Sequence, residues 1–202
     1  MKLTRLLALL LPLMVFTAPA LAGKVALPKK IFIAPVEMPK KPDIVGRGAI
    51  LAALLGGPLG AFAADGANKD IETVYAEHLA KNHIDVGADI TFELMEQLAA
   101  RGFELVGSAD QAEAILTVHL ASYGLTAKGS AGSIPFITPN IVVRNREGKR
   151  IAYKLVVWSL VKEVERTVQP KPVADYFTDP ALLMDQMRKM NTLMIREGLN
   201  KL

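Results

Sequence analysis

The 202-residue sequence contains no cysteine. This absence excludes disulfide scaffolds, zinc sites built on thiolates and cysteine nucleophiles. It also excludes lipidation of a cysteine at a new amino terminus, which is the usual way in which a bacterial envelope protein is tied to a membrane. If this chain holds to a membrane, another segment has to provide the contact.

A strong charge of one sign is also missing. The chain has 24 Lys and Arg residues against 20 Asp and Glu residues. Lys2 and Arg5 lie in a leader that we expect to be removed, so the mature balance is 22 minus 20, or +2. A protein so close to neutrality gives no reason to expect a nucleic-acid partner.

Catalytic signatures are missing as well. There is no Gly-x-Ser-x-Gly elbow, and the glycines at 56, 57 and 60 lack the Lys-Ser/Thr pair that would hold a phosphate. Asp85 and Asp89 lie one turn apart near an expected helix start, where carboxylates complement the helix dipole and cap the backbone. We therefore expect a protein that is not an enzyme and that has no cofactor.

The three histidines are spaced unfavourably for a metal site. His78 and His83 are five residues apart and so lie on different faces of any helix, and His119 alternates with apolar residues in an expected strand. We expect no bound metal. Our interpretation is that His78 and His83 are solvated and that His119 is partly buried.

The first 22 residues have the pattern of a secretory signal peptide. Lys2 and Arg5 form a basic start, an apolar run extends from Leu6 to Phe16, and Ala20-Leu21-Ala22 precedes Gly23 as a small-residue cleavage site. The apolar run is about half of the roughly 20 residues that a membrane-spanning helix requires, which disfavours an uncleaved anchor. We expect export, cleavage near Ala22–Gly23 and a periplasmic location, with association to the inner or outer membrane left open.

Hydrophobic periodicity predicts an α+β fold for the mature chain. Residues 23–45 form a basic, proline-rich arm that includes a first strand over 31–36, in which Pro35 indicates a strand end or an edge position. Residues 67–202 form the α+β domain, which shares that strand. The elements expected there are helices over 68–81 and 85–101, strands over 103–106 and 114–123, a loop over 126–133, a hairpin of 137–144 with 151–161, and a helix of about 20 residues from Pro180. The sheet is expected to be mixed or antiparallel, with about four to five strands and with helices packed mainly on one face.

The second arm of the hairpin carries apolar residues on both faces. Ile151, Tyr153 and Leu155 alternate with Ala152 and Val156. Strands that are apolar on both faces are typical of covered positions inside a sheet. We therefore expect this strand to be central and covered by helices.

The most unusual segment is residues 46–66, a glycine-rich apolar stretch that we expect to be helical. Small residues recur every four positions from Gly48 to Ala64, so one helix face has no bulk and another helix could approach it closely. Pro58 would break a straight helix, which favours a kinked or hairpin-like segment. The residues expected to contact membrane or a second copy of the chain are Gly48, Ala52, Leu55, Gly56, Gly60 and Ala64. The alternative is a loop folded over its own domain, with Leu54, Leu55 and Phe62 in the core.

The order of elements resembles that of small bacterial envelope accessory lipoproteins. The resemblance depends on the early strand ending in Ala34-Pro35-Val36, the expected helix before Gly102-Phe103-Glu104-Leu105-Val106, and the run from Ala109 to Val118 followed by a hairpin. These lipoproteins have an anticodon-binding-like α/β domain, as in the TolB amino-terminal domain and the curli secretion lipoprotein. The resemblance implies a non-enzymatic accessory that docks on a partner protein. This chain departs from the family in having no lipidated cysteine.

Two functions follow as hypotheses. The first is an exported, non-catalytic envelope accessory that binds an envelope protein partner, with residues 46–66 contacting membrane or a second copy in a homo-oligomer. The alternative is a soluble periplasmic binding protein for a hydrophobic ligand, with residues 46–66 as a lid.

Overall fold

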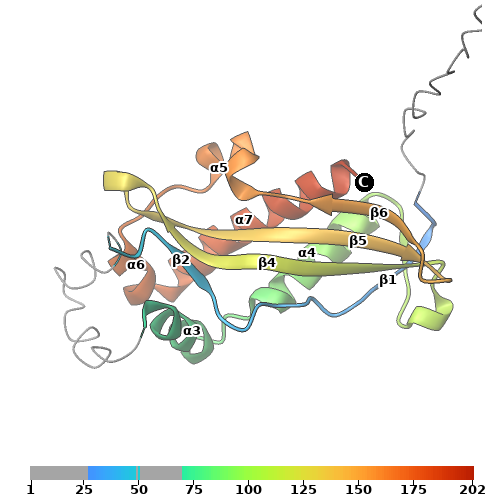
Figure 1. The fold of residues 1–202 in the computed structure, drawn as a ribbon, viewed down its shortest axis with the longest axis horizontal. Coiled ribbons are helices and arrows are strands. Elements are labelled where there is room, and N and C mark those ends of the chain that lie inside the picture. The colour runs from blue at the N-terminus through green and yellow to red at the C-terminus, as the bar shows by residue number, and fades with distance from the viewer. Residues whose placement is uncertain (1–26, 49, 51–69) are drawn as a thin grey trace, which may run out of the picture.

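The computed structural model describes residues 27–48, 50 and 70–202, and its strands form one mixed sheet (Figure 1). The strand order is β3-β1-β4-β5-β6, and β2 pairs with β4 off this path. The strands are β1 (Lys30–Ile33), β2 (Asp43–Val45), β3 (Glu104–Leu105), β4 (Ala114–Ala127), β5 (Ser133–Asn145) and β6 (Arg150–Leu155). The α-helices are α3 (Ile71–Lys81), α4 (Val86–Ala100), α5 (Lys162–Thr167), α6 (Val173–Thr178) and α7 (Pro180–Asn200). Short 3₁₀ turns lie at η1 (Ala109–Gln111), η2 (Gly129–Ala131) and η3 (Trp158–Leu160).

The longest pairing of the sheet is the antiparallel ladder between β4 and β5. It runs from the pair Ala114 and Asn145 to the pair Ala127 and Ser133, with a register shift between Leu120 and Ser122. β1 lies between β3 and β4 and is parallel to both of them. β6 is antiparallel to β5 and forms the other end of the sheet.

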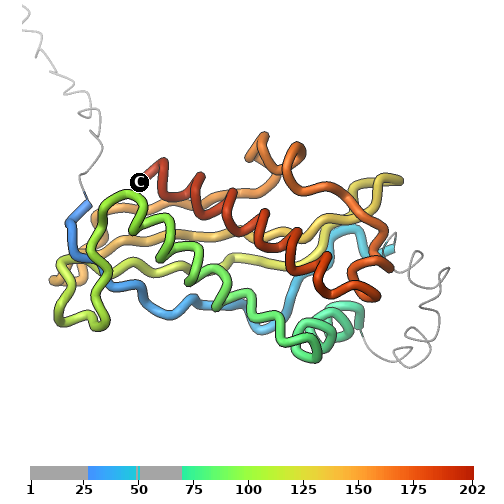
Figure 2. The backbone as a smooth tube through the Cα atoms, turned by 180° about the vertical axis from the view of Figure 1, so that it is seen from behind, coloured from blue at the N-terminus to red at the C-terminus, as the bar shows by residue number. Residues whose placement is uncertain are grey.

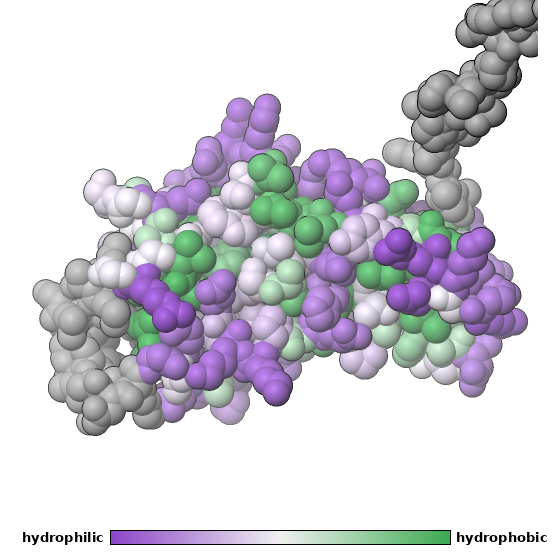
Figure 3. Space-filling view, in the orientation of Figure 1, coloured by the Kyte–Doolittle hydropathy of each residue, from purple (hydrophilic) through white to green (hydrophobic). Residues whose placement is uncertain are grey.

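Two long helices, α4 and α7, lie side by side along one face of the sheet (Figure 2). Alternate residues of β4 point at these helices, so Leu116 and Val118 are fully buried whereas His119 between Val118 and Leu120 is exposed. Figure 3 shows that the other face of the molecule carries hydrophilic residues interspersed with apolar ones. The α+β prediction, with helices mainly on one face of one sheet, is confirmed.

Aspartate side chains begin three of the helices. The carboxylate of Asp70 accepts a hydrogen bond from the Thr73 amide at 2.8 Å, and that of Asp85 accepts from the Ala88 amide at 2.9 Å. Asp179 accepts from the Leu182 amide at 3.1 Å and precedes Pro180 in the first turn of α7. Each of these side chains satisfies an amide that the helix itself leaves unpaired. The prediction that a carboxylate caps the helix start near Asp85 is therefore confirmed.

The first strand ends earlier than predicted. β1 stops at Ile33, just before Ala34-Pro35, although the amide of Ala34 still donates to the Leu116 carbonyl at 2.9 Å. Pro35 has no amide hydrogen to donate, and pairing with β4 resumes as an isolated bridge between Glu37 and His119. Pro35 therefore marks a strand end, and β1 itself is an interior strand of the sheet.

The prediction of a central, covered position for the second hairpin arm is wrong. β6 pairs only with β5, and Tyr153 and Leu155 are 47% and 40% exposed. The arm is also shorter than predicted, because the chain leaves the sheet after Leu155 and forms η3 and α5. The apolar residues of β6 thus lie at a sheet edge, where Ile151 and Ala152 are half-buried and Tyr153 and Leu155 are exposed. The local pattern does not distinguish this environment from a covered one.

The loop predicted over residues 126–133 is also shorter. β4 continues to Ala127 and β5 begins at Ser133, because the chain turns tightly through Gly132, which has φ of +113°. A Cβ at Gly132 would lie 2.3 Å from the Lys171 carbonyl oxygen, so this turn requires glycine.

The part of the chain that the structure describes has no helix that is both long and apolar enough to cross a membrane.

Candidate interaction surface

Helix α4 has two apolar stripes instead of one. The first stripe is buried against the sheet and consists of Val86, Ile90, Leu94 and Leu98. The second faces solvent and consists of Ala88, Phe92, Met95 and Ala99. Phe92 is 61% exposed and Met95 is 47% exposed, which places two large apolar side chains side by side in water. A helix that packs on a core in this way normally carries polar residues on its outer face.

A shallow hollow of about 700 Å³ lies beside the second stripe. Its wall is made by α4 and by Leu105 of β3, the strand at the end of the sheet. The full lining is Phe92, Glu93, Met95, Glu96, Gln97, Ala99, Ala100 and Leu105. We call this surface the α4–β3 face. Neighbouring exposed apolar side chains beside a hollow make this face a candidate interaction site.

The charged groups that line the α4–β3 face are acidic. Glu93 accepts hydrogen bonds from the Thr192 hydroxyl at 2.8 Å and from the Gln97 side chain, both of which are neutral. Glu96 is exposed and has no ion pair among the described residues. α4 itself contains no Lys, Arg or His. The two carboxylates that border the apolar centre thus have no ion pair among the described residues, and Arg101 Nη1 contacts Gln97 Oε1 at 3.2 Å.

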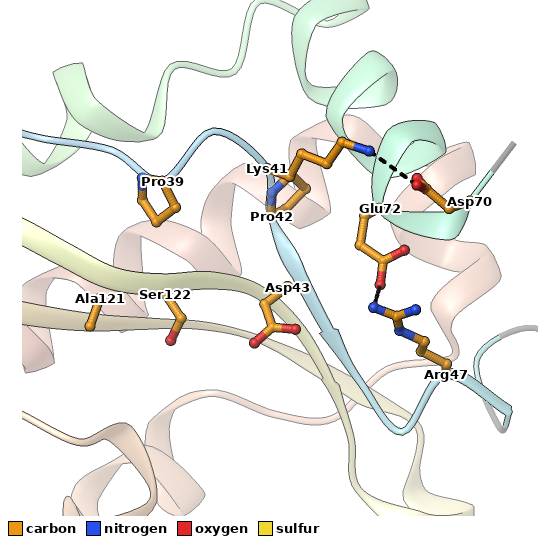
Figure 4. A pocket seen from close by; sticks show the side chains of 9 residues that line it. All are labelled: Pro39, Lys41, Pro42, Asp43, Arg47, Asp70, Glu72, Ala121 and Ser122. Atoms are coloured by element: carbon orange, nitrogen blue, oxygen red, sulfur yellow. Dashed lines mark hydrogen bonds and ion pairs between the residues drawn. The ribbon is translucent and has the colours of Figure 1, made fainter.

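A second hollow, of about 370 Å³, is charged rather than apolar (Figure 4). Two ion pairs lie along it: Lys41 Nζ with Asp70 at 3.0 Å and Arg47 Nη2 with Glu72 Oε1 at 2.5 Å. Hydrogen bonds from Thr73 and Lys41 lower the pKa of Asp70 to about 2. The Glu72 side chain is only 7% exposed, whereas that of Arg47 is 61% exposed. These charges pair with each other within the protein, which makes them structural groups.

A third hollow, of about 600 Å³, lies where α3 ends and α4 begins. Apolar residues such as Met38, Leu79 and Ile84 dominate its lining, and the ring of the half-buried Tyr123 closes one side. Burial raises the pKa of the Tyr123 hydroxyl. His83 also lines this hollow. Its φ of +54° is a left-handed backbone conformation in the turn between α3 and α4.

The three histidines lie apart from one another, and two of them differ from our interpretation. His83 is exposed as expected. His78, which we expected in solvent, is buried, with 6% of its surface exposed. His119, which we expected to be partly buried, is exposed. Helix periodicity places His78 on the inner face of α3 with Tyr75 and Leu79, while His119 lies on the open face of the sheet. Among the described residues there is no group of three His, Cys, Asp or Glu side chains that could hold a metal ion.

The buried ring of His78 is fully engaged. Its Nε2–H donates to the Tyr176 carbonyl at 3.1 Å, since a carbonyl can only accept. Its Nδ1 accepts from Nδ2 of the Asn82 side chain at 3.3 Å. The ring also lies 4.7 Å from that of Phe177, measured between centroids. Burial lowers the pKa of this imidazole, so the neutral form is favoured and His78 ties α3 to α6.

Most of the residues predicted to contact membrane or a second copy lie outside the described part of the chain. This holds for Ala52, Leu55, Gly56, Gly60 and Ala64. Gly48 is described and exposed, with nothing within 4 Å of the position that a Cβ would take. Ile50 is 1% exposed and belongs to the core. The start of the 46–66 segment is therefore attached to the domain, and the contact predicted for the rest of it stays a prediction.

Sequence analysis did not single out the α4–β3 face. Helical spacing alone groups Phe92 and Met95 with the apolar residues Ile90, Leu94 and Leu98 of the same helix. The spacing of residues 88, 92, 95 and 99 follows a repeat of four, three and four, which is the pattern of a helix–helix seam. This spacing is the sequence signal for a second stripe. A single core-facing stripe would not include both positions 86, 90, 94 and 98 and positions 88, 92, 95 and 99.

No protein-family model and no curated protein matches this sequence. Solved structures with a partial likeness include a hypothetical protein from Chlamydia trachomatis, with 11% identity, a TM-score of 0.40, and coverage of 85% of this chain and 93% of that one. A lipoprotein from Neisseria meningitidis has 18% identity and a TM-score of 0.26, over 63% of this chain and 80% of that one. A minor lipoprotein from Acinetobacter baumannii has 10% identity and a TM-score of 0.27, over 84% of this chain and 94% of that one. At such values we infer function from the residues of this chain alone.

Proposed function

We propose that this chain is an exported, non-catalytic accessory protein of the bacterial envelope that binds a partner protein. The observation that supports partner binding is the exposure of Phe92 and Met95, at 61% and 47%, beside the hollow of the α4–β3 face. Aromatic and methionine side chains are enriched in the centres of protein interfaces and provide much of their binding energy. Each hollow described here opens broadly to solvent, whereas a hydrophobic-ligand site buries most of its ligand.

The export and envelope parts of the proposal depend on the sequence. The basic start, short apolar run and small-residue cleavage site within residues 1–22 are the support for export. A non-catalytic role is supported by the structural engagement of four acidic side chains: Asp70, Asp85 and Asp179 cap helices, and Glu72 is paired with Arg47.

Partner binding can be tested by photo-crosslinking from single sites in cells that naturally express the protein. A photoreactive phenylalanine analogue is placed at Phe92 and, as a matched control, at Tyr153, which is an aromatic residue of 47% exposure at the other end of the sheet. We expect a discrete crosslinked species from position 92 and none of the same mass from position 153. Absence of any product from position 92, or identical products from both positions, would contradict partner binding through this face.

The predicted contact of residues 46–66 with membrane or a second copy needs a separate experiment. Arg47 and Ile50 contact Glu72 and the core, so the variant keeps them and replaces only residues 51–66 with a Gly/Ser linker of equal length. After carbonate extraction we expect the native protein in the membrane fraction and the variant in the supernatant. Equal distribution of both proteins, together with an unchanged oligomeric state, would refute this part of the proposal.

A further inference from the structure

We infer that the partner at the α4–β3 face contributes a helix whose apolar residues are flanked by Lys or Arg. This inference rests on the proposed function, because it names the chemistry of the partner bound there. Two independent properties of the face support it: the spacing of its apolar residues and the sign of the charge along its border.

The spacing favours a helical partner. Ala88, Phe92, Met95 and Ala99 are all exposed and are separated by four, three and four residues. Positions with this spacing form a straight seam on an α-helix, into which the side chains of a second helix interdigitate. The seam covers eleven residue steps, or about 17 Å at 1.5 Å per residue. Its two large side chains are central and its two alanines are terminal, so contact with a partner helix would centre on Phe92 and Met95.

A strand is a poorer match to this face. β3 forms the end of the sheet, but it has only the two residues Glu104 and Leu105. Added strands are held mainly by main-chain hydrogen bonds along an edge, and two residues provide few of them. Glu104 is also engaged with Lys30 of the neighbouring strand at 3.5 Å.

The charge favours a basic partner. Glu93 and Glu96 line the hollow, and none of the described residues that line it is basic. Arg101, which follows α4, donates to the Asn200 side chain of α7 at 2.8 Å, and to the carbonyl and the side-chain oxygen of Gln97 at 2.9 and 3.2 Å. It forms no ion pair with Glu93 or Glu96 among the described residues. Lys or Arg on the partner would neutralise the two glutamates at the border of the interface.

The same charge disfavours two other occupants. A second copy bound through this face would bring both sets of glutamates together, and α4 offers no basic residue to offset them. An anionic lipid surface would be repelled by the same groups. A basic, amphipathic protein helix satisfies both the apolar seam and the acidic border.

The test combines the photoreactive group at position 92 with charge reversal in the full-length protein. Glu93→Lys and Glu96→Lys are introduced together, and Glu147→Lys with Glu163→Lys, two exposed positions away from the hollow, is the matched control for net charge. We expect the double reversal at 93 and 96 to lower the yield of the position-92 crosslink about tenfold or more. The control should change the yield less than about twofold. Thermal melts of both variants verify that each one folds.

The outcomes separate the inference from the proposed function. A protein crosslink from position 92 whose yield is unaffected by reversal at 93 and 96 would leave partner binding intact and overturn the basic-helix inference. Mass spectrometry of the product locates the partner segment, and a segment that is not helical, or that lacks Lys and Arg, would also overturn it. A product with the mass of two copies of this chain, or a lipid adduct, would identify one of the disfavoured occupants. The absence of any product from position 92 would refute the proposed function itself.

Discussion

Arg47 Nη2 lies 2.5 Å from Glu72 Oε1, and this ion pair joins the two stretches of chain that flank residues 51–69. A second pair, Lys41 with Asp70, joins the same two stretches. The described residues on either side of this range are thus held at one place on the domain. Whatever residues 51–69 contact, the domain fixes the position of both of their ends.

Loss of the Arg47 charge should destabilise the protein because it leaves a buried carboxylate without a cation. We expect Arg47→Met to lower the free energy of unfolding by about 1–3 kcal/mol, as for other unsatisfied buried polar groups. The double variant Arg47→Met/Glu72→Met should recover much of this loss, since it removes the buried charge as well. Urea unfolding measures both values. Equal stability of the Arg47→Met variant and the native protein would show that Glu72 does not need its partner.

Stability should fall as the pH drops below the ordinary histidine pKa, because of His78. Burial lowers the pKa of His78 from its ordinary value of 6.5, so the unfolded chain binds a proton more readily than the folded one. The contribution of the neutral ring is fully present above pH 6.5 and declines as the pH falls from there towards the folded pKa. His78→Gln should flatten the dependence of the unfolding free energy on pH between about 7 and 5. His83→Asn, at an exposed position, is the control and should leave the slope unchanged.

Gly124 should not tolerate a side chain. Its φ is +153°, and a Cβ there would lie 1.8 Å from the Asp43 carbonyl oxygen, where β2 pairs with β4. We expect Gly124→Ala to separate β2 from β4 and to cost about 2 kcal/mol or more of stability. Gly107→Ala, at a position with no atom within 4 Å of the new Cβ, should change stability by less than about 0.5 kcal/mol. Comparable losses for both variants would contradict the close approach of β2.

Asn191 is an amide buried in α7 without a partner. It is 2% exposed, and neither Oδ1 nor Nδ2 has a hydrogen bond in the described part of the protein. Replacement by an apolar residue of similar size removes this penalty, so Asn191→Leu should raise the free energy of unfolding by about 1 kcal/mol. Gln186→Leu is the matched comparison, because Gln186 is 3% exposed but accepts a hydrogen bond from the Gln169 amide at 3.1 Å. The Gln186→Leu variant should lose stability because it removes this hydrogen bond. Denaturant melts that rank the two variants in the opposite order would contradict this account of the buried amides.

Local sequence determined the helices and their starts. Asp85 before the apolar stripe of α4 and Asp179-Pro180 before α7 depend only on neighbouring amides and on the fixed φ of proline, so they were predictable. The apolar spacing within α7 is also a local pattern, and its Met187, Met190 and Met194 are buried. The general α+β arrangement follows from the change between helical and strand periodicity along the chain.

Tertiary structure decided what each element faces. The apolar pattern of β6 is compatible with a covered strand and with an edge strand. Tyr153 is exposed because β6 pairs with β5 on one side and forms the end of the sheet on the other. His78 and His119 exchanged their expected environments because burial depends on which face the neighbouring elements cover. The candidate site has the same origin: α4 carries apolar residues on two sides, and one side packs on the sheet. The sequence determined that both stripes exist, whereas packing alone left Phe92 and Met95 exposed.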